Sequence, residues 1–168
     1  MLRKELIVVL IISALVVCTP ISECKIFKPS RPTIPIDELL SAPEQIEIGG
    51  RKYVLETYLW RDFMPISPPD GEPLIALVWI TATDSLEFPA SVDGDRLWIV
   101  NGQEVWETKF SDEELPEESH RKHQLAKIAR NGPKWGPGIQ VDVVVRVIDE
   151  KNNTYLLRAS NQWIHRTD

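Results

Sequence analysis

The stretch DRLWIVNGQEVWETKF, residues 95–110, decides the fold class of this chain. Two runs rich in Trp, Val and Ile flank an Asn-Gly pair, which is a strong short-range signal for a β-hairpin. Asn101 and Gly102 suit a type I′ turn, because both central residues of that turn need a positive φ. The stretch therefore predicts two antiparallel strands joined by a two-residue turn.

The register of this hairpin assigns its two faces. It pairs Val100 with Gln103, Trp98 with Val105, Leu97 with Trp106 and Arg96 with Glu107. One face then carries Leu97, Ile99 and Trp106 and is predicted to be core. The other face is mixed, because an opposite-charge pair flanks Trp98. A partly apolar outer face suggests a cover, which is the N-terminal arm, a helix or a partner.

The same alternation of apolar runs and turn signals continues through residues 45–168. Gly49-Gly50 separates two strand-like runs, and residues 74–82 are nearly all apolar, as expected for a central strand covered on both faces. A second hairpin turns at residues 149–153, and its valines at 141, 143, 145 and 147 share one face. About seven short strands predict an all-β domain, an antiparallel Ig-like β-sandwich.

One short helical insertion is expected in segment 111–138. Ser119 can cap its start, Leu125 and Ile128 supply an apolar stripe, and Asn131-Gly132-Pro133 ends it. An acidic stretch, SDEELPEES, precedes the helix. A long connection of this kind is either functional or tolerated.

The chain carries no catalytic, nucleotide-binding or zinc-protease motif, so we predict no catalytic residue, no cofactor and no metal. His120 and His123 are three residues apart, a usable metal spacing, but a solvated polar surface explains them as well. Asp93 and Asp95 flank Gly94, which fits either a calcium loop or an Asp-Gly turn. Whether they bind calcium stays open.

Tryptophans are the remaining candidates for a binding site, because Trp combines a large area with a polar handle. Trp79 and Trp106 are predicted to be core. Trp60, Trp98 and Trp163 are candidate surface platforms for a peptide or a sugar. The partner-binding residues that we predict are Trp98, Arg96 and Trp135, the last in the Pro- and Gly-rich loop GPKWGPG.

A net charge of −6 and the absence of a basic patch argue against nucleic acid as a partner. The N-terminus points to a membrane instead. Residues 1–4 are basic and residues 6–17 are apolar, which matches a secretory signal better than a spanning helix, because about 20 apolar residues are needed to cross a bilayer. An uncleaved signal anchor is the alternative.

The sequence LVVC at residues 15–18 resembles a bacterial lipobox, although Val17 departs from the small residue usual before the Cys. The resemblance implies acylation of Cys18 and anchoring of the exported chain to a membrane. A disulfide between Cys18 and Cys24, or removal of the whole segment, are the alternatives. Residues 1–18 are therefore interpreted as a lipoprotein-type signal segment.

Residues 19–44 form a Pro-rich tether, which favours extended structure except for one helical turn at residues 36–41. It is either a spacer or an arm that packs on the domain. The whole chain is interpreted as an exported, membrane-tethered, non-catalytic binding or assembly module of the cell envelope, which holds another envelope protein. The alternative is an envelope enzyme or enzyme inhibitor with its site in residues 111–138.

Overall fold

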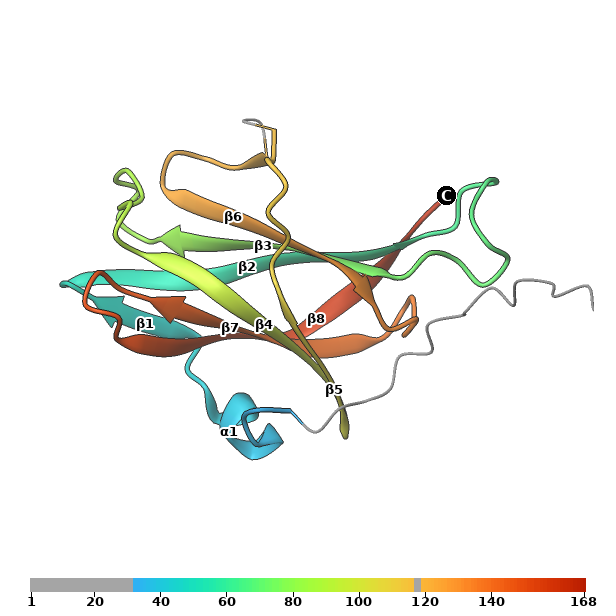
Figure 1. Cartoon of the computed structure of the whole chain (residues 1–168), viewed down its shortest axis with the longest axis horizontal. Coiled ribbons are helices and arrows are strands. Elements are labelled where there is room, and N and C mark those ends of the chain that lie inside the picture. Colours follow the sequence, from blue (N-terminus) through green and yellow to red (C-terminus); the bar gives the residue numbers. More distant parts are fainter. Residues whose placement is uncertain (1–31, 117–118) are drawn as a thin grey trace, which may run out of the picture.

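The computed structural model describes residues 32–116 and 119–168 of the chain (Figure 1). In this part a short helix, α1 (Ile36–Ser41), precedes the strands. The strands are β1 (Gln45–Ile48), β2 (Arg51–Asp62), β3 (Leu74–Ala82), β4 (Asp93–Asn101), β5 (Glu104–Lys109), β6 (Gln124–Gly132), β7 (Gln140–Ile148) and β8 (Thr154–Thr167). The all-β prediction is confirmed, and α1 is the helical turn expected in the Pro-rich tether.

The strands follow one continuous path, β5-β4-β7-β8-β2-β3-β6, with β1 paired to β2. Strand β8 joins the two halves: its first part pairs antiparallel with β7, and residues 164–167 pair parallel with β2. The sheet is therefore mixed and curls through β8 (Figure 1). The expected wholly antiparallel arrangement is wrong at the β2–β8 pair, which sequence alternation does not reveal.

The main core lies on the inner face of the curled sheet. All inward positions expected from the two hairpins are buried there, namely Leu97, Ile99, Trp106, Val141, Val143, Val145 and Val147. Strand β3 lies between β2 and β6, as expected for a central strand. Gly132 of β6 faces Trp106 of β5, so the two ends of the path meet across the core.

The first hairpin has a different turn from the predicted one. Asn101 pairs with Glu104, so Gly102 and Gln103 form the turn. The φ angle of Gly102 is +60°, whereas the φ angle of Asn101 is not positive. This fits a turn with Gly at its first central position and does not fit a type I′ turn centred on Asn101 and Gly102. Because the register moves by two residues, every side chain keeps its predicted face.

The helix predicted within residues 119–131 is wrong. Residues 124–132 form β6, which pairs antiparallel with β3. Leu125 packs against the main core, while Ile128 lies opposite Leu77 on the outer face. Pairing with a nearly all-apolar neighbour outweighs the three-residue spacing that suggested a helix. Segment 111–138 is thus no helical insertion, because it supplies a strand of the sheet.

Candidate binding surfaces

The N-terminal arm, residues 32–44, covers the outer face of β4, β5 and β7 (Figure 1). A second apolar cluster is buried there, made of Leu39, Ala42, Trp98, Val100, Val105 and Val144. Trp98 is 0% exposed. The sequence allowed the N-terminal arm, a helix or a partner as the cover of this mixed face, and in the structure the arm covers it.

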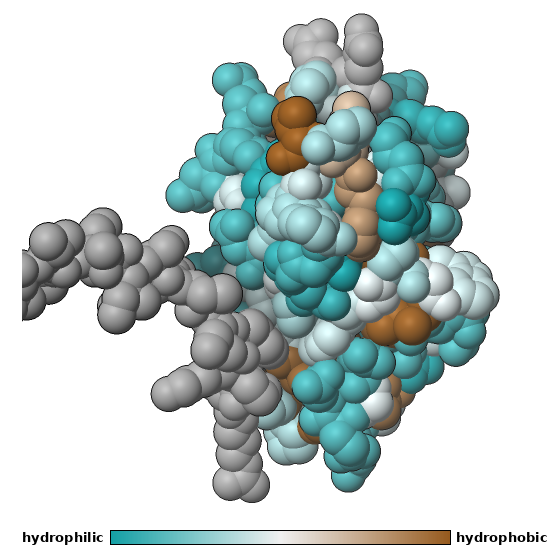
Figure 2. All heavy atoms as spheres, turned by 90° about the vertical axis from the view of Figure 1, so that its right-hand side faces the viewer, coloured by the Kyte–Doolittle hydropathy of each residue, from teal (hydrophilic) through white to brown (hydrophobic). Residues whose placement is uncertain are grey.

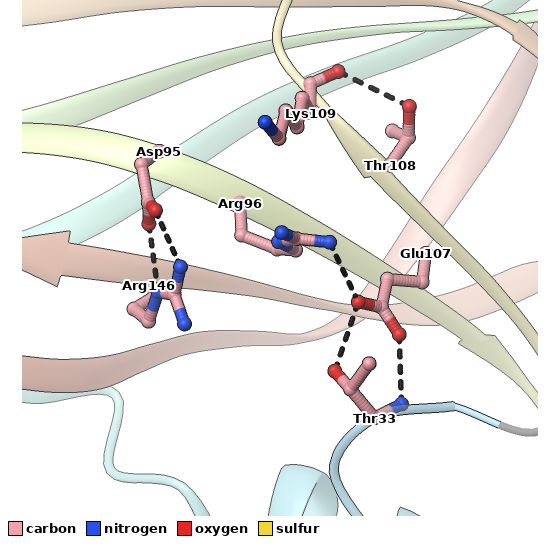
Figure 3. Close-up of polar contacts among 7 residues, drawn as sticks. All are labelled: Thr33, Asp95, Arg96, Glu107, Thr108, Lys109 and Arg146. Atoms are coloured by element: carbon pink, nitrogen blue, oxygen red, sulfur yellow. Dashed lines mark hydrogen bonds and ion pairs between the residues drawn. The ribbon is translucent and has the colours of Figure 1, made fainter.

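Polar contacts fasten the start of the arm. The backbone N–H and the hydroxyl of Thr33 each donate to the Glu107 carboxylate at 2.8 Å, and Arg96 Nη1 lies 3.0 Å from the same carboxylate (Figure 3). Burial alone would raise the pKa of Glu107, but the two bonds from Thr33 and the charge of Arg96 help to hold this pKa below its ordinary value. Arg96 therefore helps to hold the Glu107 carboxylate that fastens Thr33 of the arm.

The end of the arm is fastened by β8. The guanidinium of Arg158 donates to the Leu40 carbonyl, and the backbone N–H of Arg158 donates to the Pro43 carbonyl at 2.9 Å. The Ser160 hydroxyl donates to the Glu44 carboxylate. With both ends held and an apolar centre, the arm belongs to the packing of the domain.

The outer face of β2 and β8 carries a group of solvent-exposed rings. We call Tyr58, Trp60, Trp163 and His165 the aromatic face. Tyr58 lies between Trp60, at 5.3 Å between ring centroids, and His165, at 5.1 Å with only 17° between the ring planes. Tyr58 is 40% exposed and Trp163 is 52% exposed.

The pleat of β2 and β8 explains why these rings share one face. Leu59 and Ile164 pair with each other and point into the main core, so the residues on either side of them point outward. Sequence reasoning named Trp60 and Trp163 separately but did not bring them together. The alternations Tyr58-x-Trp60 and Trp163-x-His165 were present, but only the parallel β2–β8 pairing makes them neighbours.

Trp135 is partly buried and packs against the main core from the loop after β6. His120 and His123 precede β6, so the length of this strand, roughly 26 Å for eight steps, separates them from Trp135. These residues of segment 111–138 do not converge on one pocket.

The two carboxylates considered as calcium ligands each contact a different basic side chain. Asp93 lies 2.7 Å from Lys127 Nζ, and Asp95 forms an ion pair with Arg146 (Figure 3). The bond from Arg146 lowers the pKa of Asp95 below its ordinary value. Among the described residues, no group of three or more His, Cys, Asp or Glu side chains is placed to hold a metal ion.

Cys18 and the rest of residues 1–31 lie outside the described part of the chain. Within residues 32–116 and 119–168, no helix has the length and hydropathy needed to cross a bilayer. Comparison with known proteins finds no matching family model, no matching curated protein and no matching solved structure.

Proposed function

We propose that this chain is an exported, non-catalytic binding module, tethered at the outer side of a membrane, that holds another envelope protein. The basic start, the apolar run and the lipobox-like Cys18 support the tether. The two halves of the curled sheet enclose one main core, which supports the proposal that the domain is Ig-like in a broad sense. The observation that carries the binding role is the difference between the two outer faces.

One outer face is closed by the chain's own arm, while the other leaves the aromatic face open to solvent. Exposed Trp and Tyr side chains are enriched at the energetic centres of protein interfaces. The arm already occupies Trp98 and Arg96, so a partner would reach them only after displacing the arm. We therefore assign the partner to the aromatic face, with Trp163 as its anchor.

The packing of the rings favours a protein partner over a sugar. A sugar stacks on a free ring face, but Tyr58 is stacked against His165 and tilted against Trp60. Rings at these distances cover part of each other's faces, which leaves less free ring face for a sugar to stack on. Exposed Tyr and Trp side chains next to one another also suit the apolar side chains of a protein partner.

The test combines in-cell photo-crosslinking with a point variant. A photoreactive residue at position 163 is expected to form one discrete adduct, and the same residue at position 86 none. Leu86 is the matched control because it is also exposed, at 62%, but lies in the β3–β4 loop. Trp163→Ala should reduce capture of the crosslinked protein by at least about tenfold while costing less than about 1 kcal/mol of stability.

Adducts at positions 163 and 86 alike, or capture that survives Trp163→Ala, would overturn the assignment of the aromatic face. The tether is tested separately by the intact mass of the protein from the membrane fraction. A mass that begins at Cys18 with added acyl chains is expected. A mass without lipid and without the apolar run would remove membrane tethering from the proposal.

A further inference from the structure

The loop between β2 and β3, residues 63–73, presents two apolar side chains to solvent. Ile66 is 97% exposed and Met64 is 47% exposed. The loop extends from the end of the molecule that Figure 2 faces, where the surface is mostly hydrophilic with small, separate hydrophobic patches. Single exposed apolar residues are ordinary, so exposure alone does not indicate that Met64 and Ile66 bind anything.

The base of the loop is clamped. Two guanidiniums lie close to the Phe63 ring, that of Arg61 at 5.0 Å and that of Arg166 at 4.0 Å from the ring centroid. The backbone N–H of Phe63 donates to the Thr167 carbonyl at 2.8 Å. The C-terminal ends of β2 and β8 therefore hold the first residue of the loop in place.

Arg61 holds the loop to its neighbour. Its side chain is 3% exposed and donates to four backbone carbonyls, those of Asp70, Glu72, Lys134 and Gly136. Burial lowers its pKa, because the charged form loses its contact with water. A cation this deeply buried is retained only where its donors are satisfied, so these bonds fix the loop against the β6–β7 connection.

The tip is also ordered. The Ser67 N–H donates to the Met64 carbonyl at 2.7 Å, and the Gly71 N–H donates to the Pro68 carbonyl at 2.8 Å. Prolines at 65, 68 and 69 restrict the backbone further. The loop therefore presents Met64 and Ile66 on a fixed frame, which lowers the entropic cost of burying them in a ligand.

We propose that this loop inserts Met64 and Ile66 into the lipid surface to which the chain is tethered. The inference rests on the proposed tether. An extended chain from Cys18 to Pro32 spans at most about 50 Å, which keeps the domain near the bilayer but leaves its orientation open. A second, weak contact is then enough to orient the domain, because the tether supplies a high effective concentration.

Two features favour lipid over a protein pocket. Two side chains bury far less than the roughly 1,000 Å² that a stable protein interface needs. Two flanking pairs of opposite charge also lie in contact, Lys134 with Asp70 at 2.7 Å and Arg166 with Asp168 at 2.7 Å. The rim carries little net charge, so insertion should be the same in zwitterionic and anionic vesicles.

Met64 itself is the reporter, because Met1 is the only other methionine. The full chain is reconstituted into protein-free phosphatidylcholine vesicles and treated with peroxymonosulfate, an anionic oxidant that stays in water. Mass spectrometry then follows the sulfoxide at Met64. We expect oxidation to be at least about tenfold slower in the wild type than in Ile66→Ser, since burial of Ile66 drives insertion.

The matched control is Leu86→Ser, which removes a similar exposed side chain from another loop and should leave Met64 protected. If the chain floats with the vesicles but Met64 reacts equally in wild type and Ile66→Ser, the loop proposal is overturned and the tether stands. A chain that does not float overturns both. Protection in native membranes but not in lipid vesicles would replace lipid by a protein pocket.

Discussion

Leu39 of the N-terminal arm and Trp98 of β4 lie in one apolar cluster, and neither exposes any surface. An isolated helix of six residues is not stable in water, so α1 forms because it docks on this cluster. The arm thereby links the proposed tether to the packing of the domain. The described part of the Pro-rich segment is an element of the fold and not only a spacer.

Leu39→Ala should lower the free energy of unfolding by about 2–4 kcal/mol, because it removes a fully buried side chain from this cluster. Urea denaturation of the full chain measures the change. Leu86→Ala, at an exposed position, is the control and should change stability by less than about 0.5 kcal/mol. Equal stability of both variants would mean that the arm does not support the fold.

Trp98 and Trp163 should behave in opposite ways when each is replaced by Ala. Trp98→Ala should cost about 3–5 kcal/mol of stability, because Trp98 is buried beneath the arm. Trp163→Ala should cost less than about 1 kcal/mol, because half of its surface already contacts water. Thermal unfolding of both variants checks the assignment, and a stable Trp98→Ala protein would contradict the covered face.

Gly132 is required by the close approach of β6 to Trp106. A Cβ on Gly132 would lie 2.7 Å from the indole ring, well inside van der Waals contact. Gly132→Ala should therefore cost about 1–3 kcal/mol through overpacking. In a double-mutant cycle, Trp106→Leu should relieve part of this cost. Strict additivity of the two changes would show that the two residues do not touch.

Asp84 gives a pH dependence with a defined sign. Two bonds from Arg51, at 2.7 and 2.8 Å, lower the pKa of Asp84 to about 2. Because this pKa lies below its unfolded value near 4, the carboxylate stabilises the fold above about pH 4 and stops doing so as pH falls towards about 2. The urea midpoint of the wild type should exceed that of Asp84→Asn at pH 6. The same gap at pH 2 would contradict this account.

The sequence determined the elements that depend on local alternation and turn chemistry. The two positive φ values at Gly49 and Gly50, the turn at residues 149–153 and the inward valines of β7 all follow from short-range rules. The faces of the first hairpin were also predicted correctly, although its turn type was not. A shift of two residues preserves the alternation, so an error in the turn did not become an error in the core.

Tertiary structure alone decided the rest. Residues 124–132 have a spacing compatible with a helix, and only pairing with β3 makes them a strand. Trp98 and Trp163 both read as exposed platforms, and only the docking of the arm separates a buried ring from an open one. The aromatic face depends on the parallel contact of β2 with β8, about a hundred residues apart. Local patterns record which way a side chain points along its own strand, but what then meets it depends on long-range packing that no short window contains.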